Sequence, residues 1–366
     1  MVVALHCQTS RMRSRTVLAV ILTILVTFVV AACGGDGDGD GDGGEKSPTT
    51  RASTATSTSV PVFSAGIDGI TRSTSEEVTV DGGKSAWVSQ SGPRDGTPVL
   101  FVGGSATSAT VVDLVSFLSS AQDELGIRLI SVERNGFGDT PLDPSAGYQE
   151  FADTAIGVLD ELDVDDFSIV AISGGGPYAQ HVAASVPERV RSIHFAAAYS
   201  GTPDAGSLAQ LCALNADARL ALAKGYSADP ASWWSLPDDA VAHRIPGFLD
   251  AAVADGERAL KDPAAMAHEF ELFCRPTEVD LSKVDAPAFL YYSPDDSTTP
   301  LHFDDWYASK LPNVVANRRE LTGNHDEQYR HWDQILADVA WRDDPRTLVC
   351  PAGTPAPSEM VGVCLN

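Results

Sequence analysis

The segment IVAISGGGPYAQH, Ile169 to His181, places one hydroxyl group and three glycines between an apolar run and a helix-like stretch. Residues 174–179, GGGPYA, satisfy the G-x-G-x-x-G/A pattern of nucleotide-binding loops. The same segment also fits a strand–turn–helix motif that exposes a nucleophile, here Ser173. These two interpretations predict unrelated chemistries, so the surrounding sequence has to decide between them.

Short apolar runs alternate with helix-like stretches on both sides of this loop. Strands are expected at 76–80, 85–90, 98–104, 127–133, 167–172, 190–198, 287–293 and 317–323, and helices at 111–125, 151–164, 177–186 and 327–340. The first two strands form a hairpin around Asp81-Gly82-Gly83. Strands that alternate with helices predict a mostly parallel central sheet with helices on both faces.

The position of the glycine loop argues against a dinucleotide site. That fingerprint normally lies in the first strand–helix turn of its domain, with an acidic residue at the end of the next strand. Here at least two strands and two helices come first, and the next strand ends FAAAYS (195–200), without Asp or Glu. No cofactor is therefore expected.

A nucleophile elbow requires G-x-S-x-G, and its partners follow in the chain order Ser, Asp, His. Residues 171–175, AISGG, depart from this pattern only by Ala171 in place of the first glycine. Strand and helix approach closely around such a turn, so the position requires a small side chain. Alanine meets that requirement, and the segment is interpreted as an elbow centred on Ser173.

Four segments between about Pro98 and Ala340 resemble the α/β-hydrolase superfamily. ISGGGPYAQHVAASVPERV resembles the elbow and following helix of its lipases, esterases and small hydrolases. RLISVERNGFGDT resembles the D-R-P-G-x-G-x-S loop, with Glu133 and Asn135 as departures. PAFLYYSPDDSTTP resembles the acid-bearing turn G-x-x-D-x-x-x-P, with Ser for the glycine, and LTGNHDEQYRHWDQILADV resembles the G-x-x-H segment.

This resemblance implies an α/β-hydrolase fold in which Ser173 is the nucleophile. The register of the two later segments selects Asp296, over its neighbour Asp295, as the acid, and His325 as the base. A serine nucleophile, in place of the aspartate of epoxide hydrolases and haloalkane dehalogenases, implies acyl transfer with a small-molecule acyl substrate. The N–H group of Gly174 is expected to supply half of the oxyanion hole.

The other half of the oxyanion hole falls to Ser105, which follows Gly103-Gly104. The family usually has His-Gly at that pair. Glycine in place of histidine removes no N–H donor, but it leaves the rigidity of the loop open. A weakened or reshaped oxyanion hole is therefore one reading of this departure.

Between Tyr199 and Asp285 the alternation is broken, and helical pieces occur without a convincing strand. The pattern predicts a helical lid (about 199–285) inserted before the acid-bearing strand. Trp233-Trp234 within it either line an apolar substrate cavity or form the core of the lid. The identity of the substrate is not readable from this segment.

The remaining histidines are expected to be structural. His331 lies inside the closing helix, and His181, His194, His243 and His268 lie in helices or strands without a motif. HFDDWY (302–307) could suggest a metal held by His302, Asp304 and Asp305, but a solvated loop is the preferred interpretation. No metal is expected.

The first 32 residues are interpreted as a signal peptide, with three arginines before the uncharged run Thr16 to Ala32. This run ends in VVAAC (29–33), which resembles the lipobox of bacterial lipoproteins and makes Cys33 the lipidated first residue of the mature chain. The alternative is an uncleaved signal anchor with an ordinary Cys33. Either way the protein is expected to be extracytoplasmic and attached to the bacterial cell membrane.

Residues 33–75 are rich in Gly and Asp and then in Ser and Thr, which predicts a flexible tether before a hydrolase domain over 76–342. The tail 343–366 is expected to be irregular. Four cysteines beyond Cys33 allow three pairings, and Cys212–Cys274 with Cys350–Cys364 are preferred because each pair falls within one segment. The net charge of −25 argues against a nucleic-acid partner.

Three functions remain open from the sequence. The first is a lipid-anchored serine hydrolase that cleaves a carboxylic ester or similar acyl bond. The second is a catalytically weak lipoprotein that uses the hydrolase pocket to bind an apolar ligand. The third is an acyltransferase that uses the same residues.

Overall fold

The computed structural model describes residues 60–61, 67–236, 240–277, 279–319, 323–345 and 347–349. The predicted signal peptide, the lipidation site Cys33 and the second predicted disulfide, Cys350–Cys364, lie outside these residues. Within the described ranges, no helix combines the length and apolar character needed to cross a membrane.

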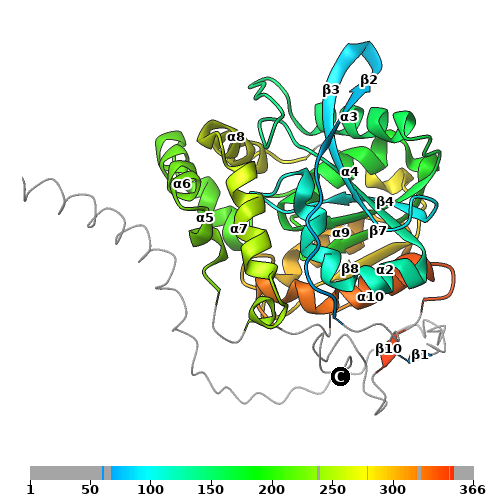
Figure 1. Cartoon of the computed structure of the whole chain (residues 1–366). Helices are drawn as coiled ribbons and strands as arrows, with labels where there is room; N and C mark the ends of the chain where they lie inside the picture. The colour runs from blue at the N-terminus through cyan, green and yellow to red at the C-terminus, as the bar shows by residue number, and fades with distance from the viewer. Residues whose placement is uncertain are drawn as a thin grey trace, which may run out of the picture. The chain divides into compact units, whose positions relative to one another are not determined.

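A sheet of eight strands forms the centre of the domain (Figure 1). Its order is β2-β3-β5-β4-β6-β7-β8-β9. The strands are β2 (Glu76–Val80), β3 (Lys84–Ser91), β4 (Thr97–Val102), β5 (Ile127–Val132), β6 (Phe167–Ile172), β7 (Val190–Ala196), β8 (Ala288–Tyr291) and β9 (Val314–Arg318). The β2–β3 and β3–β5 pairs are antiparallel and the remaining pairs are parallel, which confirms the predicted mostly parallel sheet.

Helices cover both faces of this sheet. They are α2 (Ser119–Leu125), α3 (Tyr148–Glu161), α4 (Gly176–Ser185), α9 (Leu301–Lys310) and α10 (Trp332–Ala340), with the 3₁₀ helices η2 (Ala109–Leu118) and η8 (His325–His331). Two predicted α-helices thus begin as 3₁₀ turns, at Ala109 and His325.

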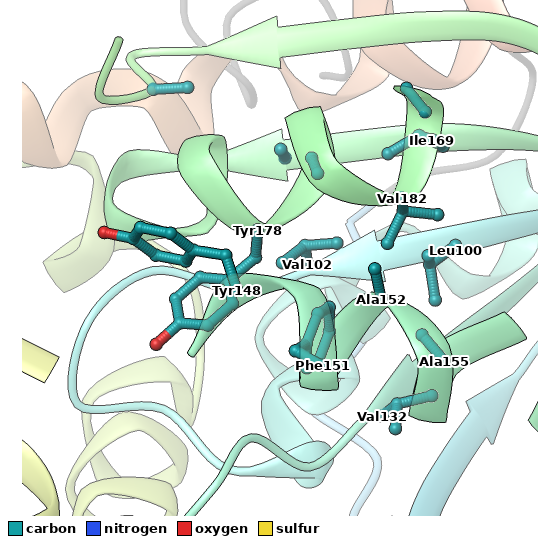
Figure 2. Close-up of a cluster of buried hydrophobic side chains, with 14 of the residues drawn as sticks. Leu100, Val102, Val132, Tyr148, Phe151, Ala152, Ala155, Ile169, Tyr178 and Val182 are labelled. Carbon is teal, nitrogen blue, oxygen red and sulfur yellow. The ribbon is translucent and has the colours of Figure 1, made fainter. Parts of the chain in front are cut away.

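Alternate residues of the strands pack into two apolar cores, one on each face. Along β4, Leu100 belongs to the first core and Phe101 to the second. Figure 2 shows part of the first core, where Leu100 and Ile169 of the sheet lie close to side chains of α3 and α4 such as Phe151 and Val182. Phe101 meets Trp332 of α10 edge to face, with ring centroids 5.0 Å apart. The sheet is therefore held rigidly at its centre, where β4 and β6 lie side by side.

The last strand differs from its prediction. It spans 314–318 and not 317–323, because its alternating, half-exposed residues give a weak apolar signal. The strand is nevertheless fixed at its end by Arg318, whose guanidinium pairs with the buried carboxylate of Asp338 in α10 at 2.8 Å. This contact joins residues of two separate elements and has no local sequence signature.

The tether was expected to run to residue 75, but its last part packs on the domain. The backbone N–H groups of Asp68, Thr71 and Ser73 donate to groups of η2 at 2.8, 2.9 and 2.8 Å. Further out, β1 (Val60–Pro61) pairs in parallel with β10 (Leu348–Val349), in a tail expected to be irregular. Neither the packing of residues 68–73 on η2 nor the β1–β10 pairing could be predicted from the Ser/Thr-rich composition, because the partners lie far away in the sequence.

The region between β7 and β8 contains helices and no strand among its described residues, as predicted. These helices are α5 (Gly206–Ala213), α6 (Ala216–Ala228), α7 (Phe248–Ala259) and α8 (Pro263–Phe273), and Figure 1 shows them grouped beside the sheet. We call residues 199–285 the helical insertion. A disulfide between Cys212 and Cys274 joins α5 to the residue that follows α8.

The two tryptophans of the insertion take part in packing. Trp233 meets Tyr226 edge to face at 4.8 Å, and Trp234 meets Phe248 at 5.7 Å. Trp234 also lies against the second core of the domain. Of the two roles considered for this pair, these contacts favour that of core residues in the insertion.

Candidate active site

Ser173 directly follows β6, at the carboxyl end of a central parallel strand. Its φ of 48° lies in the left-handed region, which is uncommon for a residue other than glycine. The backbone is held there from both sides: the Ser173 N–H donates to the carbonyl oxygen of Ala197 at 3.1 Å, and its own carbonyl oxygen accepts from the N–H of Tyr199 at 2.8 Å. The strained turn of an elbow is therefore stabilised by the end of the neighbouring strand β7.

The glycines after Ser173 are required by close approach. A Cβ on Gly175 would lie 2.3 Å from the carbonyl oxygen of Val102, and one on Gly176 would lie 2.2 Å from that of Tyr199. Both distances are far below van der Waals contact, and both neighbours are backbone atoms that have little freedom to move. The glycine run therefore lets α4 start directly against β4 and β7, in agreement with the elbow interpretation.

The structure brings the three predicted catalytic side chains together. Nε2 of His325 lies 2.9 Å from Oγ of Ser173, and Nδ1 of the same ring lies 2.9 Å from Oδ2 of Asp296. Asp296 follows β8 and His325 follows β9, so all three residues lie beyond the carboxyl ends of parallel strands. The arrangement has the geometry of a nucleophile, a base and an orienting acid.

Asp296 is buried and receives several hydrogen bonds. The N–H groups of Thr298 and Thr299 donate to Oδ1 at 2.8 and 3.0 Å, and the Thr299 hydroxyl donates to Oδ2. Burial raises the pKa of Asp296, but the charge of His325 and these hydrogen bonds outweigh it and hold the pKa below its ordinary value. The acid therefore stays ionised while the imidazole gains and loses a proton. Sequence reasoning missed the two threonines.

The electrostatics of His325 complement those of its acid. Burial lowers the pKa of the imidazole, but the attraction of Asp296 and the hydrogen bond between them outweigh this effect and raise the pKa above its ordinary value. In the neutral ring, the proton on Nδ1 faces the carboxylate, which leaves Nε2 free to accept a proton from Ser173. The site is thus arranged for general base catalysis.

The two predicted oxyanion-hole residues are neighbours in space. The position of a Cβ on Gly174 would be 2.3 Å from Oγ and 3.1 Å from N of Ser105. A Cβ on Gly104 would be 3.1 Å from the Cβ of Ser173, so this loop runs directly beside the nucleophile. The structure therefore brings the loop after β4 and the start of α4 together beside Ser173.

Arg134 holds this loop in place, a contact that sequence reasoning missed. Its Nη1 and Nη2 donate to the carbonyl oxygens of Gly103 and Gly104, both at 2.8 Å. The hydroxyl of Thr107 donates to the Gly104 carbonyl oxygen as well, at 2.7 Å. The rigidity that a Gly-Gly sequence left open is thus supplied by side chains. Arg134 lies in the recognisable RNGFGDT segment, but nothing in the sequence indicates that it contacts the Gly103-Gly104 loop.

Two aromatic residues close over the nucleophile. Phe273, the last residue of α8, has its Cζ 2.7 Å from the position of a Cβ on Gly174. Tyr199 meets Phe273 edge to face at 5.4 Å, its hydroxyl hydrogen bonds to Ser207 at 3.0 Å, and it also interacts with the Ser173 hydroxyl. Burial raises the pKa of Tyr199 to about 12, so the phenol stays neutral. Phe273 and Tyr199 therefore add aromatic surface to a site whose other neighbours are polar.

HFDDWY lies in helix α9 and not in the solvated loop that was expected, and its candidate metal ligands have other partners. His302 lies 3.1 Å from Asp204, and the carboxylates of Asp304 and Asp305 both pair with Arg319. No group of three His, Cys, Asp or Glu residues in the described part of the chain is placed to hold a metal ion.

Among the other histidines, His331 lines a small cavity together with Asp296 and His325. His331 is buried at the end of η8. His194 is buried in the sheet, hydrogen bonded to Ser192 and Tyr291 at 2.9 and 3.0 Å, and burial lowers its pKa to about 3. It therefore stays neutral at physiological pH, as a structural residue does. His181 is near Gln149, and His268 is near the carbonyl oxygen of Ala146. His243 lies in a short 3₁₀ helix of the insertion.

Comparison with known proteins supports the fold. No known family profile matches this sequence. Over 118 residues the chain is 29% identical to YcgS of Bacillus subtilis, which is described as an uncharacterized hydrolase. That match covers 32% of this chain and 39% of YcgS, so the chain spans about two fifths of the length of this relative.

Solved structures match over a much larger part of the chain. An enol-lactonase from Burkholderia xenovorans has a TM-score of 0.56 and 15% identity, and covers 71% of this chain and 96% of its own. An esterase from Exiguobacterium antarcticum has the same TM-score and identity, with 73% and 99% covered. An α/β hydrolase fold protein from Nakamurella multipartita has a TM-score of 0.51 and 20% identity, with 74% and 98% covered. The mostly parallel sheet, the elbow and these matches together show that this chain has the α/β-hydrolase fold.

Proposed function

We propose that the protein is an extracytoplasmic, lipid-anchored serine hydrolase that cleaves a carboxylic ester or a related acyl bond through an acyl-enzyme. The observation that carries this proposal is the contact of His325 with Ser173 and Asp296, at 2.9 Å on each ring nitrogen. The similar structures include an enol-lactonase and several esterases, which is in keeping with this proposal.

The chemistry follows from the positions of these groups. Oγ of Ser173 attacks the carbonyl carbon of the substrate while its proton moves to Nε2 of His325. The N–H groups of Gly174 and Ser105 stabilise the oxyanion of the tetrahedral intermediate. The bond to the leaving alcohol then breaks, and the alcohol takes the proton from His325. Water repeats the sequence on the acyl-enzyme, which releases the acid and restores the serine.

A fluorophosphonate probe tests the nucleophile. The wild-type protein should be labelled at Ser173 and should hydrolyse p-nitrophenyl esters, whose graded chain lengths would also reveal the acyl preference. Ser173→Ala should abolish both signals, while Ser185→Ala at the end of α4 should leave them intact. A wild-type protein that is neither labelled nor active would overturn the proposal and favour a ligand-binding protein, and turnover that survives Ser173→Ala would overturn the assignment of the nucleophile. An ester product formed with an added alcohol would instead identify an acyltransferase.

The membrane anchor is a second part of the proposal, supported by the VVAAC segment before the Gly/Asp-rich stretch. Metabolic labelling with an alkynyl fatty acid in a bacterial host should mark the wild-type protein. Cys33→Ala should lose the label, whereas Cys7→Ala, within the same predicted signal peptide, should keep it. A chain that keeps its signal peptide and takes up no label would instead be an uncleaved signal anchor.

A further inference from the structure

Helix α8 of the insertion contacts Gly174, one half of the candidate oxyanion hole, and Arg134, which holds the loop that carries the other half. Glu269 and Phe273 are one helical turn apart and lie on the same face of α8. Oε1 of Glu269 accepts from Nε of Arg134 at 2.9 Å, and the ring of Phe273 packs where a side chain on Gly174 would be. If the insertion served only to keep water away from Ser173, it would not need the ion pair between Glu269 and Arg134.

The three nitrogens of the Arg134 guanidinium each have a close partner, and Nη2 also lies 3.5 Å from the carbonyl oxygen of Thr107. Nε pairs with Glu269, and Nη1 and Nη2 donate to the carbonyl oxygens of Gly103 and Gly104. Because the guanidinium is planar, the pair with Glu269 fixes the plane in which the other two donors lie. Lysine offers a single nitrogen and has no such geometry.

Holding the Gly104 carbonyl oxygen also sets the direction of the next N–H. A trans peptide is planar, so the C=O of Gly104 and the N–H of Ser105 point in opposite directions. Arg134 and Thr107 hold that oxygen at 2.8 and 2.7 Å. The N–H of Ser105 is thereby turned away from Arg134. Within the described residues it has no protein acceptor, which leaves it available to an oxyanion.

The energetics of the pair favour a positioning role. Arg134 and Glu269 are 3% and 1% exposed, and a buried ion pair is often no more stabilising than apolar side chains of similar size. Oε2 of Glu269 is buried without a hydrogen-bond partner among the described residues, which adds to the cost. Stability alone therefore gives little reason for this pair.

We propose that Arg134, oriented by Glu269 of α8, is a positioning residue that aims the Ser105 N–H at the oxyanion. The helical insertion is then part of the frame of the catalytic site as well as its cover. This inference rests on the proposed function.

The test compares variants of the full-length chain by steady-state kinetics on the preferred p-nitrophenyl ester. Arg134→Lys should lower kcat by about 10- to 100-fold. Deletion of an oxyanion-hole donor lowers kcat by about 10²- to 10³-fold, and a donor that is present but misdirected should cost part of that amount. KM should change by less than about threefold. Glu269→Gln keeps an acceptor for Nε, so its loss should be smaller than that of Glu269→Leu.

A matched control exists at the other end of β6. Arg189 also donates to two consecutive backbone carbonyls, those of Val164 and Asp165 at 2.6 and 2.8 Å, and pairs with the carboxylate of Asp160. Because its partners precede β6 whereas Ser173 follows it, Arg189→Lys should leave kcat unchanged.

The affinity for a trifluoromethyl ketone with the same acyl chain is a second measurement. It should not change if Arg134 has only a structural role. The ketone forms a tetrahedral adduct whose oxyanion needs the same donors, so its affinity should fall in parallel with kcat/KM. Thr107→Val removes the other hydrogen bond to Gly104 and should act in the same direction, which keeps the test usable if Arg134→Lys does not fold. A folded Arg134→Lys that keeps wild-type kcat and inhibitor affinity overturns the inference. If Arg134→Lys does not fold, a Thr107→Val variant with wild-type kcat and inhibitor affinity overturns it. A wild-type protein without esterase activity or fluorophosphonate labelling overturns the proposed function first, and the inference with it.

Discussion

Replacement of Asp296 by asparagine isolates the role of the acid. Oδ1 of Asp296 accepts from the N–H groups of Thr298 and Thr299, so in Asp296→Asn the amide oxygen should take that position. The amide NH₂ then faces Nδ1 of His325, which becomes an acceptor. The ring proton moves to Nε2, and this tautomer has no lone pair for the proton of Ser173.

The expected loss of activity in Asp296→Asn is large because the substitution changes both the tautomer and the pKa of His325. The wrong tautomer in a serine triad lowers kcat by roughly 10⁴-fold, which corresponds to about 5 kcal/mol in activation free energy. The carboxylate also raises the pKa of His325, and its removal should lower that pKa. The base has to be neutral, so activity falls as pH drops through its pKa. The acid limb of the remaining activity should therefore move to lower pH.

The assay is kcat/KM for a p-nitrophenyl ester as a function of pH. In the wild-type protein the acid limb should lie above the ordinary histidine pKa of about 6.5. Asp295→Asn is the matched control, because Asp295 is the exposed neighbour of the buried acid and should titrate and turn over like wild type. If Asp296→Asn stays within about tenfold of wild type with an unmoved acid limb, the assignment of the acid is refuted.

Three further outcomes concern stability. Burial raises the pKa of the Asp255 carboxyl to about 6, so the folded state binds the carboxyl proton more tightly than the unfolded state does. The stability that this proton contributes is therefore lost as pH rises from about 4 to about 6. Asp255→Asn should flatten that part of a Tm-against-pH curve, and an unchanged slope would contradict the reasoning. The Cys212–Cys274 disulfide spans a sequence separation of 62. Replacing both cysteines with serine should lower the free energy of unfolding, measured by urea denaturation, by up to about 4 kcal/mol. A loss below about 1 kcal/mol would show that the chain-entropy estimate does not apply. Gly176→Ala places a methyl 2.2 Å from a carbonyl oxygen and should destabilise by about 1–3 kcal/mol, whereas Gly225→Ala, with open space around it, should be neutral or slightly stabilising.

The catalytic candidates could be predicted because each lies close behind a strand. Ser173 and Asp296 follow apolar strands, His325 follows the weaker strand β9, and all three lie in short motifs that resemble those of the α/β-hydrolase superfamily. Parallel strands bring their carboxyl ends to one edge of the sheet. The alternation of strands and helices was strong enough to predict the sheet. It failed where the last strand alternates weakly, at 314–318, and at α9, where residues 302–307 were interpreted as a solvated loop.

The frame of the site could not be predicted, because it consists of long-range polar contacts. Arg134 and Glu269 are 135 residues apart in the sequence, and Arg134 reaches the glycine loop over about 30. No local period or composition encodes such pairs. The same reason explains why residues 68–73 were assigned to a flexible tether, although their N–H groups have acceptors on η2.

The disulfide at the end of α8 links the assembly of the site to the compartment in which the chain folds. Cysteines stay reduced in the bacterial cytoplasm and are oxidised outside it. Cys274 directly follows Phe273, so the bond that joins α5 to α8 closes one residue away from the ring that packs on Gly174. If the chain is exported, as proposed, it would lack this link before export, and oxidation would complete the insertion only afterwards. The precursor and the exported protein would then differ in how firmly the nucleophile is enclosed, without any change in sequence.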